Sequence, residues 1–152
     1  MKRYNYIRLL TLALLAISIF SIGANAQSKK DRAVAKKLTD LADRAFTTKN
    51  YREAADKYAQ SFALVPTNPF GHYRKGFAHF ELKESEQALT EFALALSQGY
   101  KPLEIFKVRA YLYYDQKNYD AALEETNKAV ALDPKNLLLL KAVGEINFSK
   151  KA

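Results

Sequence analysis

The chain has 152 residues and carries 24 Lys and Arg against 16 Asp and Glu, a formal net charge of +8. This length suits one domain with at most a short appendage. The sequence holds no Cys and only two His, which excludes disulfides, thiolate metal sites and cysteine nucleophiles. Five Gly and four Pro are too few for a low-complexity or collagen-like chain.

Residues 1–26 have the pattern of a secretory signal peptide. Basic residues precede an apolar run over 9–22, and the small residues Ala24 and Ala26 fit an A-x-A cleavage site. As a helix this run would span about 21 Å, short of the roughly 30 Å hydrocarbon core of a bilayer. An uncleaved membrane anchor is the alternative. We expect cleavage after Ala26 and export, most simply to a bacterial periplasm, where nucleic acid is not an expected partner.

After this segment, similar residues recur every 34 positions. Each unit of the recurrence has two stretches with helical periodicity, and no window alternates as a strand would. Small residues recur inside both stretches, where they allow two helices to cross closely. Pro66 and Pro134 end the second stretch, since Pro cannot continue a helix. The recurring small residues are Ala42, Gly76, Ala110 and Gly144 in the first stretches and Ala54, Ala88 and Ala122 in the second.

This pattern resembles the tetratricopeptide repeat, a helix–turn–helix unit of 34 residues. The resemblance places units at 35–68, 69–102 and 103–136, followed by a capping helix at 137–150. It implies an all-α fold, a right-handed α-solenoid of three units over 35–150. Unit 2 departs most from the pattern. There His79 stands for the usual Tyr, and Gly99-Tyr100 for the Asp-Pro ending.

Two segments at the ends of the array each allow two interpretations. Only one face of the leucine-rich helix at 137–150 can lie on unit 3. It is either an ordinary cap or a surface for self-association or a partner through 137–148. At the other end, 27–34 is a basic lead-in to the first helix. The run Lys29, Lys30, Arg32, Lys36 and Lys37 is either solvated or attracted to an anionic membrane or envelope polymer.

Neither a metal site nor catalysis is expected, and no cofactor is implied. His72 and His79 lie about 10.5 Å apart along a helix, too far to share one metal, so both are expected to pack or face a groove. Of the acids at 81, 84, 86 and 91, Glu84 and Glu86 suit a helix N-terminus. Phosphate loops, nucleophile elbows and metalloprotease motifs are absent from the sequence. The chain is therefore not expected to be an enzyme.

The resemblance also implies a concave groove lined by the first helix of each unit. We expect Phe46, Phe80 and Tyr114 to lie partly in the core, because their rings recur at one repeat position. Phe70, Tyr73, Phe77 and Tyr111 should face solvent instead, as anchors for a partner. The candidate groove residues are Lys36, Asp43, Phe70, Tyr73, Phe77, Lys107, Tyr111 and Lys141.

Some members of this family grip the terminal carboxylate of a chaperone tail with a Lys/Asn clamp. Of the matching positions here, only Arg74 has suitable chemistry, so this activity is not expected. The other matching positions are Thr39, Asp43, Glu104 and Val108.

The sequence thus predicts a scaffold that binds a protein or peptide in an aromatic groove. The alternative is a cell-envelope assembly accessory that sits on a membrane or anionic polymer through its basic N-terminus.

Overall fold

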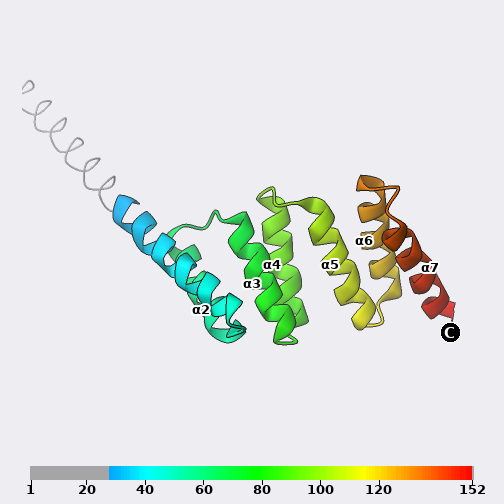
Figure 1. The fold of residues 1–152 in the computed structure, drawn as a ribbon, viewed down its shortest axis with the longest axis horizontal. Helices are drawn as coiled ribbons and strands as arrows, with labels where there is room; N and C mark the ends of the chain where they lie inside the picture. The colour runs from blue at the N-terminus through cyan, green and yellow to red at the C-terminus, as the bar shows by residue number, and fades with distance from the viewer. Residues whose placement is uncertain (1–27, 152) are drawn as a thin grey trace, which may run out of the picture.

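A computed structural model describes residues 28–151, and this part of the chain consists of helices joined by short connections. The predicted signal peptide lies outside the described residues. The helices stand side by side in a row along the long axis of the molecule (Figure 1). No helix within 28–151 combines the length and apolarity needed to cross a bilayer. In chain order they are a helix over 28–47, α2 (Tyr51–Leu64), α3 (Pro69–Glu81), α4 (Ser85–Ser97), α5 (Pro102–Asp115), α6 (Tyr119–Leu132) and α7 (Leu137–Lys151).

The order of helices is that of three helix pairs and a final single helix, as the tetratricopeptide pattern implies. The pairs are the 28–47 helix with α2, α3 with α4, and α5 with α6. The described part of the basic lead-in, 28–34, is already helical and continues into the first helix of unit 1. Its lysines therefore have a fixed direction relative to the array.

The turn inside each pair has the same backbone conformation. Lys49, Lys83 and Lys117 have φ angles of 62°, 63° and 59°, in the left-handed region. In the second turn, the N–H of Lys83 donates to the carbonyl of Phe80 at 3.0 Å and the next N–H donates to that of His79 at 2.9 Å. A left-handed residue with these two bonds is a Schellman cap, which satisfies the last carbonyls of the first helix.

The connection from α4 to α5 uses the same cap with glycine. Gly99 has a φ of 86°, and the N–H of Tyr100 donates to the carbonyl of Ala95 at 2.9 Å. Pro102 is then the first residue of α5, where its missing N–H costs nothing and its fixed φ suits a helix. Gly99-Tyr100 is thus a helix cap in its own right, and it carries the Tyr100 ring toward α3.

Small residues lie at the helix crossings, as the 34-residue recurrence predicts. Ala54, Ala88 and Ala122 are each fully buried, with 0% of their surface exposed. A Cβ placed on Gly76 would lie 2.7 Å from the Phe92 ring, so α4 approaches α3 this closely only because residue 76 is glycine. The buried side chains form two clusters, one joining units 1 and 2 and one joining units 2 and 3.

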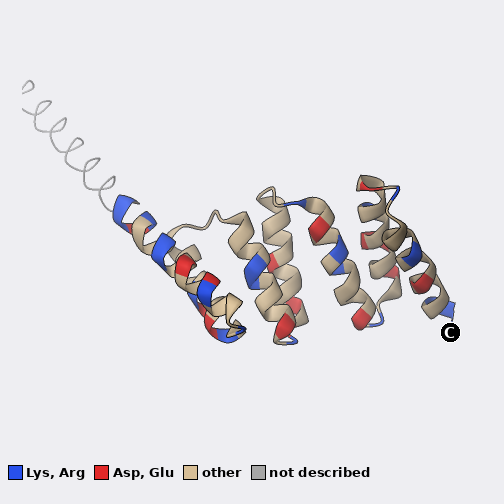
Figure 2. Ribbon diagram, viewed as in Figure 1, with Lys and Arg blue, Asp and Glu red and all other residues tan. Residues whose placement is uncertain are grey.

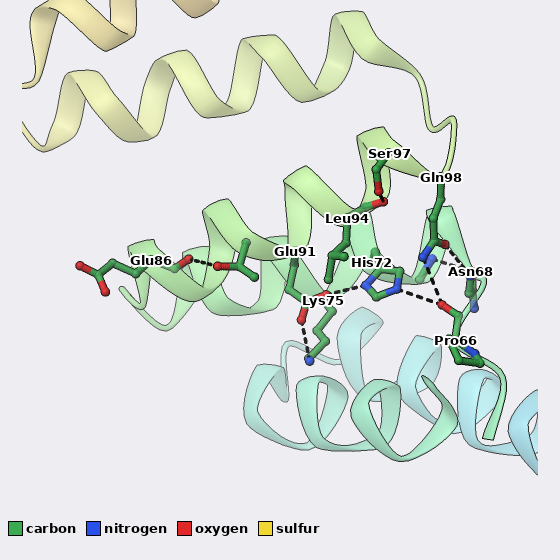
Figure 3. A network of polar contacts seen from close by, with 11 residues as sticks. Pro66, Asn68, His72, Lys75, Glu86, Glu91, Leu94, Ser97 and Gln98 are labelled. Atoms are coloured by element: carbon green, nitrogen blue, oxygen red, sulfur yellow. Dashed lines mark hydrogen bonds and ion pairs between the residues drawn. The ribbon is translucent and has the colours of Figure 1, made fainter. Parts of the chain in front are cut away.

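A buried polar network ties unit 1 to unit 2 (Figure 3). His72 presents Nδ1 to Glu91 Oε2 at 2.6 Å and Nε2 to the carbonyl of Pro66 at 3.2 Å, so both ring nitrogens face acceptor oxygens. Lys75 donates to the other Glu91 oxygen at 2.7 Å. The Phe62 ring of α2 lies 4.1 Å from the imidazole. His72 is therefore a packing residue, one of the two roles expected for it.

Candidate peptide-binding groove

A hollow of about 440 Å³ lies between α3 and α5. Residues one helical turn apart share a face of a helix, so 73, 77 and 80 of α3 turn toward 104, 107, 108 and 111 of α5. The floor is mostly apolar, with Glu104 and Lys107 as its charged groups, and these two pair at 3.5 Å. The lining residues are Tyr73, Phe77, Phe80, Glu104, Lys107, Val108 and Tyr111.

A second hollow of about 340 Å³ lies between α5 and α7. Lys107 and Tyr111 line both hollows, so the two are adjacent parts of one groove. In the second, α7 contributes an aliphatic wall. The residues that line the second hollow but not the first are Ala110, Tyr114, Thr126, Leu138, Leu139, Ala142, Glu145 and Ile146.

Tyr111 is the most exposed ring of the groove, with 56% of its surface accessible. It contacts Phe80 edge to face, the ring centroids being 5.7 Å apart, so the aromatic surface continues from α3 to α5. Leu138, 79% exposed, stands at the far end. Exposed apolar groups in a hollow are the usual anchors of a binding surface.

Tyr73 and Phe77 do not face solvent, although the sequence predicted that they would. Both are half-buried and pack on the fully buried Phe92, with ring centroids 6.0 and 5.6 Å away. Tyr73 also stacks on Tyr100 at 4.5 Å. Burial, with smaller effects of Tyr100 and Glu104, raises the pKa of the Tyr73 hydroxyl. These two rings are therefore floor residues that belong partly to the core, like Phe46 and Phe80, which are half-buried as expected. Tyr114, predicted to lie partly in the core with them, is instead 39% exposed and lines the second hollow.

Asp43 is engaged by the protein itself. The buried Tyr58 hydroxyl donates to its carboxylate, and Arg74 lies 3.2 Å from the same oxygen. Burial, then the hydrogen bond to Asp43, raises the pKa of Tyr58 well above its ordinary value. The Arg74 guanidinium also lies over the Phe46 and Phe70 rings, 5.2 and 4.7 Å from their centroids. Arg74, the one candidate clamp residue, is therefore held by an ion pair and two rings.

The predicted groove residues do not all lie together. Tyr73, Phe77, Lys107 and Tyr111 line the hollow between α3 and α5, and Phe70, 43% exposed, lies beside it against Tyr100 at 6.1 Å. The remaining three are placed elsewhere. Lys36 lines a separate hollow on unit 1 and pairs with Asp40 at 3.0 Å, Asp43 pairs with Arg74, and Lys141 pairs with Glu145 at 3.5 Å.

The sequence predicted Lys141 as the contribution of α7 to the groove, whereas Leu138, Leu139, Ala142, Glu145 and Ile146 are the α7 residues that line it. Leu138 stands at the repeat position of Phe70 and Glu104, so the 34-residue register carried the signal. The predicted cap at 137–150 describes the face of α7 that packs on unit 3. It does not describe the side of α7 that faces the groove.

His79, Glu84 and Glu91 have partners within the fold. Glu84 is the N-cap residue of α4, and Glu86 lies in the first turn of this helix, as predicted. Arg52 and then His79 hydrogen-bond the Glu84 carboxylate, which lowers its pKa. Glu91 is buried, which the sequence did not indicate. Within residues 28–151 no group of three or more His, Asp or Glu is arranged to hold a metal ion.

Comparison with known proteins identifies the repeats. A model of the family described as "Tetratricopeptide repeat" matches residues 104–136, which cover α5 and α6. The fold is similar to "First TPR of Spaghetti (RPAP3) bound to HSP90 peptide SRMEEVD", with a TM-score of 0.68, 20% identity, and coverage of 80% of this chain and 96% of that one. One tetratricopeptide repeat is thus identified at 104–136, and the fold of the described residues is similar to that of a solved TPR domain. "Crystal structure of MamA protein" is a second similar structure, with a TM-score of 0.72, 18% identity, and coverage of 81% of this chain and 67% of that one.

The tetratricopeptide array also has sequence relatives. It is 27% identical over 105 residues to "Small glutamine-rich tetratricopeptide repeat-containing protein 2" of Saccharomyces cerevisiae, covering 69% of this chain and 30% of that protein. It is 25% identical over 108 residues to human "Sperm-associated antigen 1", covering 71% and 12%. The array thus spans less than a third of the length of either protein.

Proposed function

We propose that this tetratricopeptide array binds an extended peptide segment of a partner protein, and that binding rather than catalysis is its role. The joined hollows carry the proposal. They form one apolar channel from Tyr73 to Leu138. Lys107 and Tyr111 of α5 line both hollows and so connect them. Two structural neighbours support this mode of binding, because they were solved as complexes of TPR domains with HSP90 and HSP70 peptides.

The chemistry of the groove indicates which peptides fit. Each hollow offers a mostly apolar floor, so the segment should place one large apolar side chain in each. Lys107 and Glu104 already pair at 3.5 Å, which leaves little net charge to attract a strongly acidic or basic sequence. We therefore propose an apolar segment of moderate charge as the partner.

A terminal carboxylate is not expected to bind as in the chaperone-tail clamp. The clamp position 43 holds a carboxylate here, and Glu104 occupies another. Arg74, the remaining cation, is already paired with Asp43. A peptide carboxylate would therefore meet like charges, which is unfavourable at close range.

Substitution of Tyr111 tests the groove. Peptides selected on the purified chain from a phage-displayed random library would be labelled and titrated by fluorescence anisotropy. Tyr111→Ala removes the ring shared by both hollows, and loss of an anchor of about 2 kcal/mol weakens binding roughly 30-fold. Leu94→Ala is the matched control, because Leu94 is an exposed apolar residue of α4 outside both hollows.

Because Tyr111 is exposed, its substitution should change peptide binding without changing stability. With 56% of its surface accessible, the ring contributes little to the core, so circular dichroism and thermal melting should be unchanged. Tyr73 would be a poorer choice because its ring stacks on Tyr100 and packs on Phe92. Selected peptides that bind Tyr111→Ala and the wild type equally well would contradict binding in this groove.

A basic face on the first helix supports a second proposal, contact with an anionic surface of the cell envelope. Lys29, Lys30, Arg32 and Lys37 are exposed, and the basic residues gather on this helix (Figure 2). Helical spacing puts Lys29, Lys30 and Lys37 on the side away from the buried Ala35 and Ala42, whereas Arg32 lies closer to the buried face. Lys29, Lys30 and Lys37 changed to Ser should lose sedimentation with phosphatidylglycerol vesicles at low salt, whereas high salt should abolish it for the wild type. Unchanged sedimentation of the lysine variant would rule out this contact.

We propose export to a bacterial periplasm on the signal-peptide pattern of residues 1–26. The test is intact-mass measurement of the chain from cells that express the full sequence. Cleavage after Ala26 should give a species that begins at Gln27 in the periplasmic fraction. Full-length chain found only with membranes would show that the segment acts as an anchor.

A further inference from the structure

Helix α7 has two apolar faces on opposite sides. Leu139 and Ile146 are 7% and 4% exposed and pack toward unit 3. Leu137, Leu140 and Phe148 are 79%, 46% and 78% exposed. With 3.6 residues per turn, these three lie within about 60° of one direction, roughly opposite Leu139 and Ile146. Leu138 belongs to neither face, because it turns toward the groove.

Gly144 lies in the middle of this exposed stripe. It corresponds to Gly76 of unit 2, where the absence of a Cβ lets the Phe92 ring approach. A Cβ on Gly144 would have no neighbour within 4 Å. A glycine inside a helix costs stability, and here no contact within the described residues accounts for it. The position is thus shaped for a close helix crossing that residues 28–151 do not make among themselves.

The stripe is arranged symmetrically about Gly144. Leu140 lies about one turn before the glycine and Phe148 about one turn after it, and Leu137 and Lys151 lie about two turns away on either side. If a second α7 runs antiparallel across Gly144, each Phe148 ring meets the Leu140 of the other copy, twice by symmetry. A self-complementary surface of this kind is what a two-fold dimer requires.

The charges beside the stripe agree with such pairing. Lys141 and Glu145 lie on the same flank of α7 and pair within the helix at 3.5 Å. In an antiparallel pair related by a two-fold axis, the same flanks face each other. The Lys141 of one copy then lies near the Glu145 of the other. The two Glu145 carboxylates lie one residue from the axis and also approach each other, and the lysines of both copies flank them.

We propose that this surface, the Leu137–Leu140–Gly144–Phe148 stripe of α7, pairs with the same stripe of a second copy in an antiparallel helix crossing at Gly144. Leu138 and Tyr111 lie to the side of the stripe. Glu145 lines the hollow between α5 and α7 and also flanks the stripe, so the proposed dimer borders the groove at this end without covering Leu138 or Tyr111. It does not depend on peptide binding, and the two proposals fail separately.

Engineered cysteines test the crossing directly, because the natural sequence contains none. Gly144→Cys places two thiols next to each other across the two-fold axis, within the Cα separation that a disulfide needs. Under mild oxidation the purified chain should form a covalent dimer. Leu138→Cys, also at an exposed position of the same helix, is the matched control and should stay monomeric. Crosslinking of the control but not of Gly144→Cys would overturn the proposal.

Sedimentation equilibrium across the micromolar range measures the association without a crosslink. The wild type should show a monomer–dimer equilibrium. Phe148→Glu should raise its dissociation constant by on the order of 100-fold, because the contact is lost twice. Leu138→Glu should leave it unchanged, since that leucine lies outside the stripe. A wild type that stays monomeric throughout, or a Phe148→Glu chain that still dimerises, would overturn the proposal.

Discussion

At the scale of single residues, Gly76 and Gly144 occupy the same repeat position in different surroundings. A Cβ at 76 would meet the fully buried Phe92 ring at 2.7 Å, whereas one at 144 would meet nothing within 4 Å. The recurrence of small residues predicted both positions as helix crossings. Only the structure shows that one crossing is filled and the other open, since this depends on whether a second helix packs against that face.

Alanine at the two glycines should therefore have opposite effects. Gly76→Ala overpacks the α3–α4 contact, because Phe92 has no free space to move into, and should cost roughly 1–3 kcal/mol of unfolding free energy. Gly144→Ala should gain up to about 1 kcal/mol, since alanine is the better helix former and meets no clash. Urea unfolding at low protein concentration, below dimer formation, compares them. Equal effects of the two substitutions on the unfolding free energy would show that α3 and α4 pack less closely at residue 76 than the structure indicates.

The three lysines in left-handed turns offer a stabilising change. Their spacing of 34 residues is visible in the sequence, but lysine is not a residue that indicates positive φ, so the caps could not be predicted. Lys117→Gly should stabilise the chain by roughly 0.5–1 kcal/mol, because glycine adopts φ near 59° without strain. Thermal melting measures the gain. A lower melting temperature would mean that the lysine side chain contributes more than its backbone strain costs.

At the scale of elements, the sequence predicted the helices well and their side-chain environments less well. The start of α3 follows from Pro69 at its first position, and the end of α2 from the nearby Pro66. The half-buried state of Tyr73 could not be predicted in this way. It depends on the Gly99 cap turning Tyr100 back onto α3, a contact between residues of different helices.

The burial of two acids could not be predicted from the sequence, although both acids stand at the same repeat position. Glu91 and Glu125 stand 34 residues apart, as do their partners Lys75 and Arg109. A charge on a helix is usually solvated, so a single acid in the sequence does not indicate burial. The recurrence of the whole pair at one register is visible in the sequence, but only the structure shows that these charges pack between helices.

Removal of the Glu91 charge should destabilise the joint between units 1 and 2. Glu91→Gln keeps the size of the side chain but leaves the buried His72 and Lys75 without an anion, at a cost of about 3 kcal/mol. Glu124→Gln is the control, because that side chain is 69% exposed in its pair with Lys128 and should change stability by less than about 0.5 kcal/mol. Denaturant unfolding measures both. Similar values for the two variants would indicate that water reaches Glu91.

At the scale of the whole molecule, stability is shared between neighbouring units. One cluster of buried side chains joins units 1 and 2 and another joins units 2 and 3, with α7 covering the end. In such an array each unit depends mainly on its neighbours, so damage at one end should spread only a short distance. The groove uses the same arrangement, since its two hollows are spaces between successive first helices.

Truncation after Asn136, which deletes α7, tests this description. It removes the burial of Leu139 and Ile146, worth roughly 1.5–3 kcal/mol each, and uncovers the side of α5 and α6 that they pack on. Amide hydrogen exchange should therefore speed up mainly in α5 and α6, while the 28–47 helix and α2 keep most of their protection. Peptides that rely on the hollow between α5 and α7 should lose affinity, because Leu138 and Ile146 are gone. If exchange rose equally from the first helix to α6, the chain would unfold as one cooperative body, and the groove could not be altered at one end without loss of the other.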